Sequence, residues 1–68
     1  MNRMMKWFAY EHLPIKLRGI SALCAGLAQD MDNQLPEGPE KTAGLRKLLE
    51  AKDCFVRARL EADEPKAE

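Results

Sequence analysis

The stretch Leu35-Pro36-Glu37-Gly38-Pro39-Glu40, residues 35–40, decides how this chain of 68 residues folds. A helix does not continue through two prolines and a glycine placed so close together. Gly38 is suited to the N-cap of a new helix, and Pro39 is suited to its first position. Glu40 then lies in the first turn, where its charge meets the positive end of the helix dipole. The stretch therefore predicts a tight turn that ends one helix and begins another.

A regular apolar stripe before this turn predicts the first helix over residues 14–35. We expect it to begin at Pro14, because proline disfavours helical backbone in the residue before it and itself suits a first turn. Gly19 and Gly26 each weaken the helix by about 1 kcal/mol relative to alanine, which suggests close packing or a ligand there. The stripe has the spacing of a face that packs on another helix. Its members are Leu17, Ile20, Cys24, Leu27, Met31 and Leu35.

After the turn, a second apolar side predicts a helix over residues 39–62. Lys52 and Arg59 interrupt this side, and Ala51 and Ala58 are its small members. Its large apolar residues are Leu45, Leu48, Leu49, Phe55, Val56 and Leu60. Residues 1–13 are expected to form a short N-terminal arm or helix, and residues 63–68 a frayed tail.

The expected fold class is therefore all-α, with one domain over residues 1–68 that consists of an antiparallel two-helix hairpin and an arm. A chain this short buries only a small core, and a helix pair leaves one side of that core open. The cheapest cover is another copy of the same chain, so we expect a symmetric homo-oligomer.

Composition and charge narrow the function classes. Hydrophobic residues make up 46% of the chain and charged ones 32%, which is the balance of a folded protein. Eleven basic and eleven acidic residues give a formal charge of zero, which does not favour a polycationic nucleic-acid binder. Residues 1–20 nevertheless have a local charge of +3 and residues 61–68 one of −3. A basic beginning thus precedes an acidic end.

Neither a metal site nor a membrane segment is expected. Cys24 and Cys54 belong to no Cys-x-x-Cys pair and to no Cys/His cluster of zinc spacing. No apolar run has the length of a transmembrane helix or the pattern of a signal peptide. Free thiols without an export signal indicate the cytoplasm.

The sequence has few residues in patterns that are typical of catalytic sites. His12 is the only histidine, and next to Pro14 it is expected to cap or pack rather than to act as a general base. There is no glycine-rich phosphate loop and no nucleophile elbow. Cys24 lies on the apolar stripe and is expected to be a small buried hydrophobe. We therefore expect no enzyme, no catalytic residue and no cofactor.

The N-terminal arm combines aromatic and basic side chains, a mixture that can stack bases and attract phosphate. Trp7 and Phe8 are expected to dock into the helical core, whereas Tyr10 has a polar tip and is the better ligand contact. Arg57 and Arg59 either solvate the second helix or complete an anionic site with a neighbour's arm in an oligomer. The nearby basic residues are Arg3, Lys6, Lys16 and Arg18.

Three segments together resemble the helical-hairpin domain of phage anti-CBASS and anti-Thoeris proteins. They are Phe8-Ala9-Tyr10-Glu11-His12-Leu13-Pro14, the helix that ends in Leu27-Ala28, and residues 35–52, which read LPEGPEKTAGLRKLLEAK. The likeness covers roughly residues 7–60. Proteins of this family bind the cyclic nucleotide signals of bacterial antiphage defence and sequester them without hydrolysis.

The resemblance implies a compact homo-oligomer, hexameric in the anti-CBASS branch, in the host bacterial cytoplasm. Pockets between protomers would hold cyclic dinucleotides or trinucleotides, with no membrane and no DNA or RNA duplex as partner. Tyr10 matches the family's base-stacking tyrosine, and Glu11 and Thr42 match positions of weaker polar contacts. Ser21 stands where some relatives have a basic phosphate-binding residue, and Cys54 where a large aromatic is frequent. The phosphate contact would then come from Lys16 or Arg18, or from the Ser21 hydroxyl as a neutral donor together with the charge of Arg57 or Arg59 of another subunit.

Two other functions stay open. The first is a small helical interaction or assembly protein without a small-molecule ligand, in which Tyr10 belongs to the core and the charge split sets contacts between subunits. The second is a single-stranded nucleic-acid binder that uses the aromatic arm, which the zero net charge disfavours.

Overall fold

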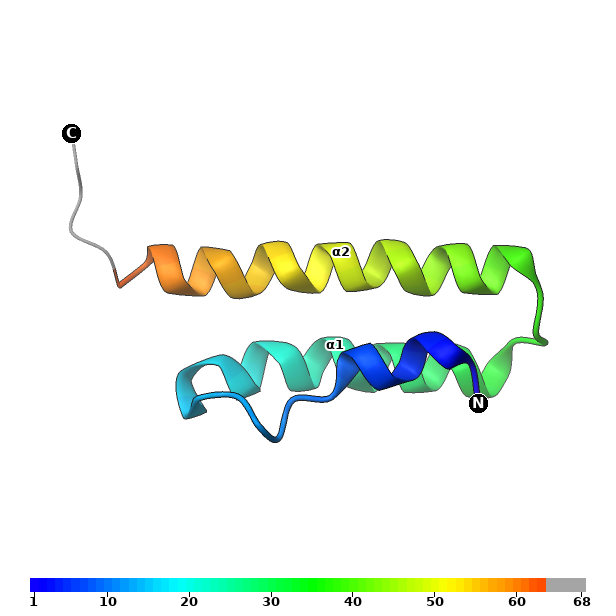
Figure 1. Cartoon of the computed structure of the whole chain (residues 1–68), viewed down its shortest axis with the longest axis horizontal. Coiled ribbons are helices and arrows are strands. Elements are labelled where there is room, and N and C mark those ends of the chain that lie inside the picture. Colours follow the sequence, from blue (N-terminus) through cyan, green and yellow to red (C-terminus); the bar gives the residue numbers. More distant parts are fainter. Residues whose placement is uncertain (64–68) are drawn as a thin grey trace.

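The computed structural model describes residues 1–63, and in them three helical elements follow one another without a strand. They are the 3₁₀ helix η1 (Arg3–Phe8), α1 (Ile15–Gln34) and α2 (Pro39–Glu61). Figure 1 shows α1 and α2 as an antiparallel hairpin with η1 lying beside α1. The all-α hairpin is confirmed, and each helix end lies within one residue of its predicted position. Residues 64–68 of the predicted tail lie outside the described residues.

The turn between the helices has the predicted capping. Gly38 is the N-cap of α2, Pro39 is its first residue and Glu40 lies in its first turn. The backbone N–H of Thr42 donates to the carbonyl oxygen of Gly38 at 3.1 Å, which begins the helical hydrogen bonding. At the start of α1, Pro14 is the cap and not the first helical residue, and its carbonyl oxygen accepts from Leu17 N–H at 2.9 Å.

The core lies where η1 meets both long helices. Phe8 is only 2% exposed and packs with Cys24 and Ala28 of α1 and with Leu45 of α2. The prediction that Phe8 and Cys24 are buried is thus confirmed. Four larger side chains are partly buried and pack against this cluster, namely Met4, Met5, Leu48 and Leu49. Small side chains on α1 let the arm approach closely enough for the Phe8 ring to fill the space between the helices.

The buried face of α1 differs from the predicted stripe. The buried positions after Leu17 are Ser21, Cys24, Ala28 and Asp32. The predicted members Ile20, Leu27 and Met31 each lie one residue earlier, which is a rotation of about 100° around the helix. They are half-buried or exposed. The arm covers one side of the contact between α1 and α2. Ile20, Leu27 and Met31 border the other side of that contact.

Two smaller expectations were wrong. Trp7 does not dock into the core: its side chain is 56% exposed, and Lys6 Nζ lies 5.0 Å from the ring centroid. The 3₁₀ helix η1 packs on the hairpin through Phe8. The side chain of Trp7, the adjacent residue, is therefore directed away from the core. Gly19 and Gly26 do not mark close packing within the protomer, because a Cβ atom at either position would meet nothing within 4 Å, and the other half of that expectation, a ligand there, stays a prediction.

Candidate functional site

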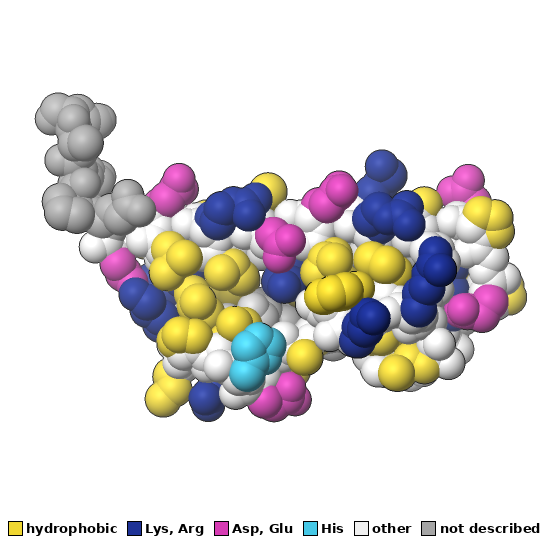
Figure 2. All heavy atoms as spheres, in the orientation of Figure 1, with side chains coloured by type: hydrophobic (Ala, Val, Ile, Leu, Met, Phe, Trp, Pro, Cys, Tyr) yellow, Lys and Arg dark blue, Asp and Glu magenta, His cyan; other side chains and the backbone are white. Residues whose placement is uncertain are grey.

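Because the hairpin is antiparallel, it brings the beginning of α1 next to the end of α2, and basic side chains from both helices meet there. Lys16 Nζ lies 2.8 Å from Oδ2 of Asp63, and Arg59 Nη1 lies 3.7 Å from Oδ1 of the same residue. We call this end of the hairpin the basic end, defined by Lys16, Arg18 and Arg59. Figure 2 shows hydrophobic side chains gathered at the same end, with basic and acidic ones at its edges.

Tyr10 lies in the connection between η1 and α1, a few residues before the start of α1. Tyr10 is half-buried, and its carbonyl oxygen accepts from Leu13 N–H at 3.1 Å. The carbonyl oxygen of Leu13 in turn accepts from Arg18 Nε at 2.7 Å, so the arm's turn and the first turns of α1 are joined. Glu11 is exposed, and its Oε1 accepts from the Tyr10 backbone N–H at 3.3 Å. Two hydrogen bonds therefore join the turn that contains Tyr10 to Arg18 of α1.

The remaining predicted site residues lie in different surroundings. Arg57 is exposed, and its Nη2 donates to Cys54 Sγ at 3.3 Å. Ser21 is 1% exposed, and its hydroxyl has no hydrogen-bond partner within residues 1–63. Thr42 lies at the opposite end of the hairpin, near the turn. Its Oγ1 accepts from Asn2 Nδ2 at 3.0 Å.

An open apolar groove of about 540 Å³ runs between α1 and α2 and ends at the basic end. Leu23 and Phe55 line it from opposite helices, although they are 75% and 55% exposed, and Arg59 borders it. A second groove of about 280 Å³ shares Leu27 and Leu48 with the first and continues towards the turn. We call these two together the seam groove. Large exposed leucine and phenylalanine side chains in one continuous groove are typical of an interaction surface.

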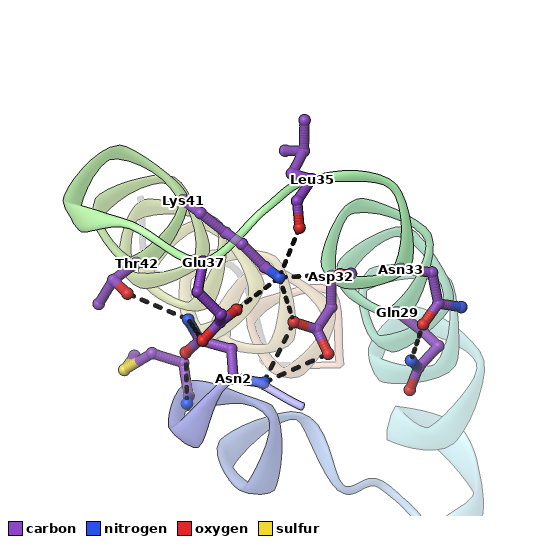
Figure 3. A network of polar contacts seen from close by, with 9 residues as sticks. Asn2, Gln29, Asp32, Asn33, Leu35, Glu37, Lys41 and Thr42 are labelled. Atoms are coloured by element: carbon purple, nitrogen blue, oxygen red, sulfur yellow. Dashed lines mark hydrogen bonds and ion pairs between the residues drawn. The ribbon is translucent and has the colours of Figure 1, made fainter.

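Sequence analysis missed a buried polar network at the turn end, which Figure 3 shows from close by. Lys41 Nζ lies 2.8 Å from Oδ1 of Asp32 and 2.6 Å from Oε1 of Glu37, and it also donates to the carbonyl oxygens of Asp32 and Leu35. The backbone N–H of Asn2 donates to both carboxylate oxygens of Asp32, at 3.1 and 3.3 Å. The network thus ties the arm to the hairpin.

Charge pairing shifts the pKa values of three groups. The hydrogen bond from Lys41 lowers the pKa of Asp32 below its usual 3.8, although burial opposes this, and the Asn2 N–H lowers it further. The same bond and the one to Glu37 raise the pKa of Lys41 above 10.5. The hydrogen bond from Lys16 and its charge lower the pKa of Asp63, and the charge of Arg59 lowers it further. All three groups are therefore charged at neutral pH.

The described residues contain little that resembles a catalytic or metal centre. No group of three or more His, Cys, Asp or Glu side chains within residues 1–63 is placed to hold a metal ion. His12 is exposed at the arm's turn, and Cys24 is buried in the core. No helix in this part of the chain is long and apolar enough to cross a bilayer. What the arrangement does offer is an apolar groove that reaches the basic end.

Comparison of the chain with protein-family models, with curated proteins and with solved structures finds no match.

Proposed function

We propose that the chain assembles into a homo-oligomer that binds cyclic oligonucleotide signals of bacterial antiphage defence and sequesters them without cleaving them. The resemblance of residues 7–60 to phage anti-CBASS and anti-Thoeris proteins suggests this ligand class, and it suggests a hexamer. In this proposal Tyr10 stacks on a base, while the basic end meets the phosphates. Such a protein works in the host cytoplasm and needs neither a cofactor nor a nucleic-acid duplex.

The observation that supports ligand binding best is the clustering of predicted site residues. Two hydrogen bonds join the turn that contains Tyr10 to Arg18 of α1, and Arg59 at the end of α2 shares the Asp63 carboxylate with Lys16. A nucleotide needs a stacking surface within a few ångströms of cations that meet its phosphates. In this proposal Tyr10 supplies the stacking surface, and Lys16, Arg18 and Arg59 supply the cations.

The observation that supports assembly is the seam groove. Leu23 and Phe55 expose most of their apolar surface to water, and burying such surface contributes about 25 cal/mol per Å². A second copy of the chain has the same groove and is the simplest complementary partner, since most small homo-oligomers pair identical surfaces. Arg59 borders the groove, so assembly through it would bring the basic ends of two protomers near a shared ligand.

The experiment that tests the ligand is a thermal-shift screen against a panel of cyclic di- and trinucleotides, with the linear dinucleotides as controls. A ligand at 100 times its dissociation constant adds about 2.7 kcal/mol, or roughly 10–20 °C in a domain of this size. A rise with at least one cyclic compound and not with its linear form is expected. Equal melting temperatures across the whole panel would contradict the proposal.

The same exposed groove favours a second candidate, an assembly protein without a small-molecule ligand. Leu23→Asp is expected to dissociate the oligomer without unfolding the chain, because Leu23 is 75% exposed in the protomer. Ile15→Asp is the matched control, since Ile15 is 81% exposed on the same helix and lines neither part of the groove. Oligomer loss in Leu23→Asp together with a flat thermal-shift panel would favour this candidate over the sequestering protein.

A further inference from the structure

We propose that the Asp63 carboxylate is an internal competitor, which occupies the phosphate-binding cations Lys16 and Arg59 until an anionic ligand displaces it. This inference rests on the proposed function, because the phosphates of a cyclic nucleotide are the ligand that it concerns. It adds a regulatory contact to the basic end: the protein's own carboxylate sets how tightly that end holds a phosphate.

The geometry places one carboxylate between cations from two different helices. Lys16 lies in the first turn of α1 and Arg59 in the last turn of α2. Lys16 bonds Oδ2 of Asp63 at 2.8 Å, and Arg59 approaches Oδ1 at 3.7 Å. Two oxygens of a phosphate group would meet the same two cations in the same way.

Backbone hydrogen bonds hold Asp63 in this position. Ala62 N–H donates to the carbonyl oxygen of Ala58, and Asp63 N–H donates to that of Leu60, both at 3.1 Å. Asp63 thus continues from the end of α2 in a turn, and its side chain reaches across to α1. The contact therefore belongs to the ordered end of the hairpin.

The three side chains are exposed enough for displacement. Lys16, Arg59 and Asp63 are 46%, 42% and 44% exposed, and ion pairs at this exposure contribute little to stability. A phosphodiester group offers two free oxygens and one negative charge, as the carboxylate does, and a cyclic nucleotide adds further phosphate and base contacts that Asp63 lacks. It can therefore replace Asp63 without unfolding either helix. Because the contacts of Asp63 must be broken first, Asp63 lowers the affinity of the basic end for phosphate.

Asp63→Asn tests this directly, because it keeps the side chain's shape and removes its charge. We expect it to bind cyclic di-AMP and inorganic pyrophosphate roughly 2- to 5-fold more tightly than the parent, with the gain reduced at high salt. Glu61→Gln is the matched control: it makes the same charge change two positions earlier, and Glu61 forms no ion pair with another described residue. In the double variant Lys16→Ala/Asp63→Asn the gain should disappear. Isothermal titration calorimetry at two salt concentrations gives these affinities.

The outcomes separate this inference from the proposed function. If the parent binds the cyclic dinucleotide and Asp63→Asn binds neither probe more tightly than Glu61→Gln does, the competitor role is refuted while the function stands. If no variant binds cyclic di-AMP but Asp63→Asn gains affinity for pyrophosphate, the competitor role stands and cyclic di-AMP is not the ligand. Failure of all variants to bind either probe refutes the competitor role, and the thermal-shift panel decides the function separately.

Discussion

Lys41 Nζ lies 2.8 Å from Oδ1 of Asp32, and the two side chains are only 6% and 4% exposed, although one ends α1 and the other begins α2. Asp32 also accepts the backbone N–H of Asn2, thirty positions earlier in the chain. One carboxylate therefore holds together the arm, the first helix and the second helix. In a domain with so small an apolar core, this polar junction is a main determinant of where the arm lies.

The Asp32 junction predicts a large effect of a small substitution. Asp32→Asn keeps the shape but leaves buried Lys41 with Glu37 as its only acidic partner among the described residues. Removing one partner of a buried ion pair is strongly destabilising, and we expect the melting temperature to fall by roughly 10 °C or more. Asp30→Asn, on the exposed side of the same helix, should melt close to the parent. Equal melting temperatures for the two variants would show that the junction does not stabilise the fold.

The shifted pKa values predict how stability depends on pH. Lys41 lowers the pKa of Asp32 in the folded chain below the 3.8 of an unfolded aspartate, so the folded state binds fewer protons in acid. The stability from this pair is present above about pH 3.8 and is lost as the pH falls through the lowered value. The raised pKa of Lys41 sets the alkaline limit: its contribution is fully present below pH 10.5 and is lost as the pH rises through the raised value. Urea unfolding from pH 7 to pH 2 should show the acid loss in the parent and a flatter curve in Asp32→Asn. Parallel curves would assign the acid loss to other groups.

The arm's docking is tested by two adjacent aromatic residues. Phe8→Ala should cost about 3–5 kcal/mol, because the ring is 2% exposed and the cavity lies between three elements. Trp7→Ala removes an even larger ring that is 56% exposed, so it should cost far less. Urea denaturation followed by circular dichroism measures both. A larger loss in Trp7→Ala than in Phe8→Ala would mean that the arm docks by its other face.

The elements of the fold could be predicted because their signals are local. Gly38, Pro39 and Glu40 specify a helix start within three residues, and the apolar spacing before and after them is helical. Which face of α1 is buried could not be predicted in the same way. Because Leu27 and Ala28 are adjacent and both apolar, the sequence permits two apolar stripes about 100° apart around α1. The docked arm covers the one with the small side chains.

The candidate site was predictable only where its residues are close in sequence or at matching ends of the hairpin. Tyr10, Lys16 and Arg18 are near one another in the chain, and an antiparallel hairpin places Arg59 at the same end. Ser21 lies on the same buried face of α1 as Cys24. The predicted stripe contained Ile20 at this turn of the helix, so it did not indicate that Ser21 is buried. The contact of Asn2 with Asp32 spans thirty residues and has no local signal.

Tyr10 is the residue by which ligand binding and folding can be separated. Base stacking contributes roughly 1–3 kcal/mol, so Tyr10→Ala should weaken cyclic nucleotide binding by about 5- to 150-fold. Tyr10→Phe keeps the stacking face and should lose much less. Both variants should keep the oligomer's mass, because Tyr10 lines neither part of the seam groove. Parent-like binding by Tyr10→Ala would refute stacking, and loss of the assembly would place Tyr10 in the core or interface.

Native mass spectrometry of the protein mixed with the panel of cyclic di- and trinucleotides tests the central claim most directly, because one spectrum reports the assembly and its ligand together. The account predicts a single homo-oligomer whose mass increases by whole numbers of an uncleaved cyclic nucleotide, which is released at its intact mass when the complex is denatured. A folded monomer that gains no mass with any member of the panel, or an oligomer that releases linear nucleotide, would contradict it.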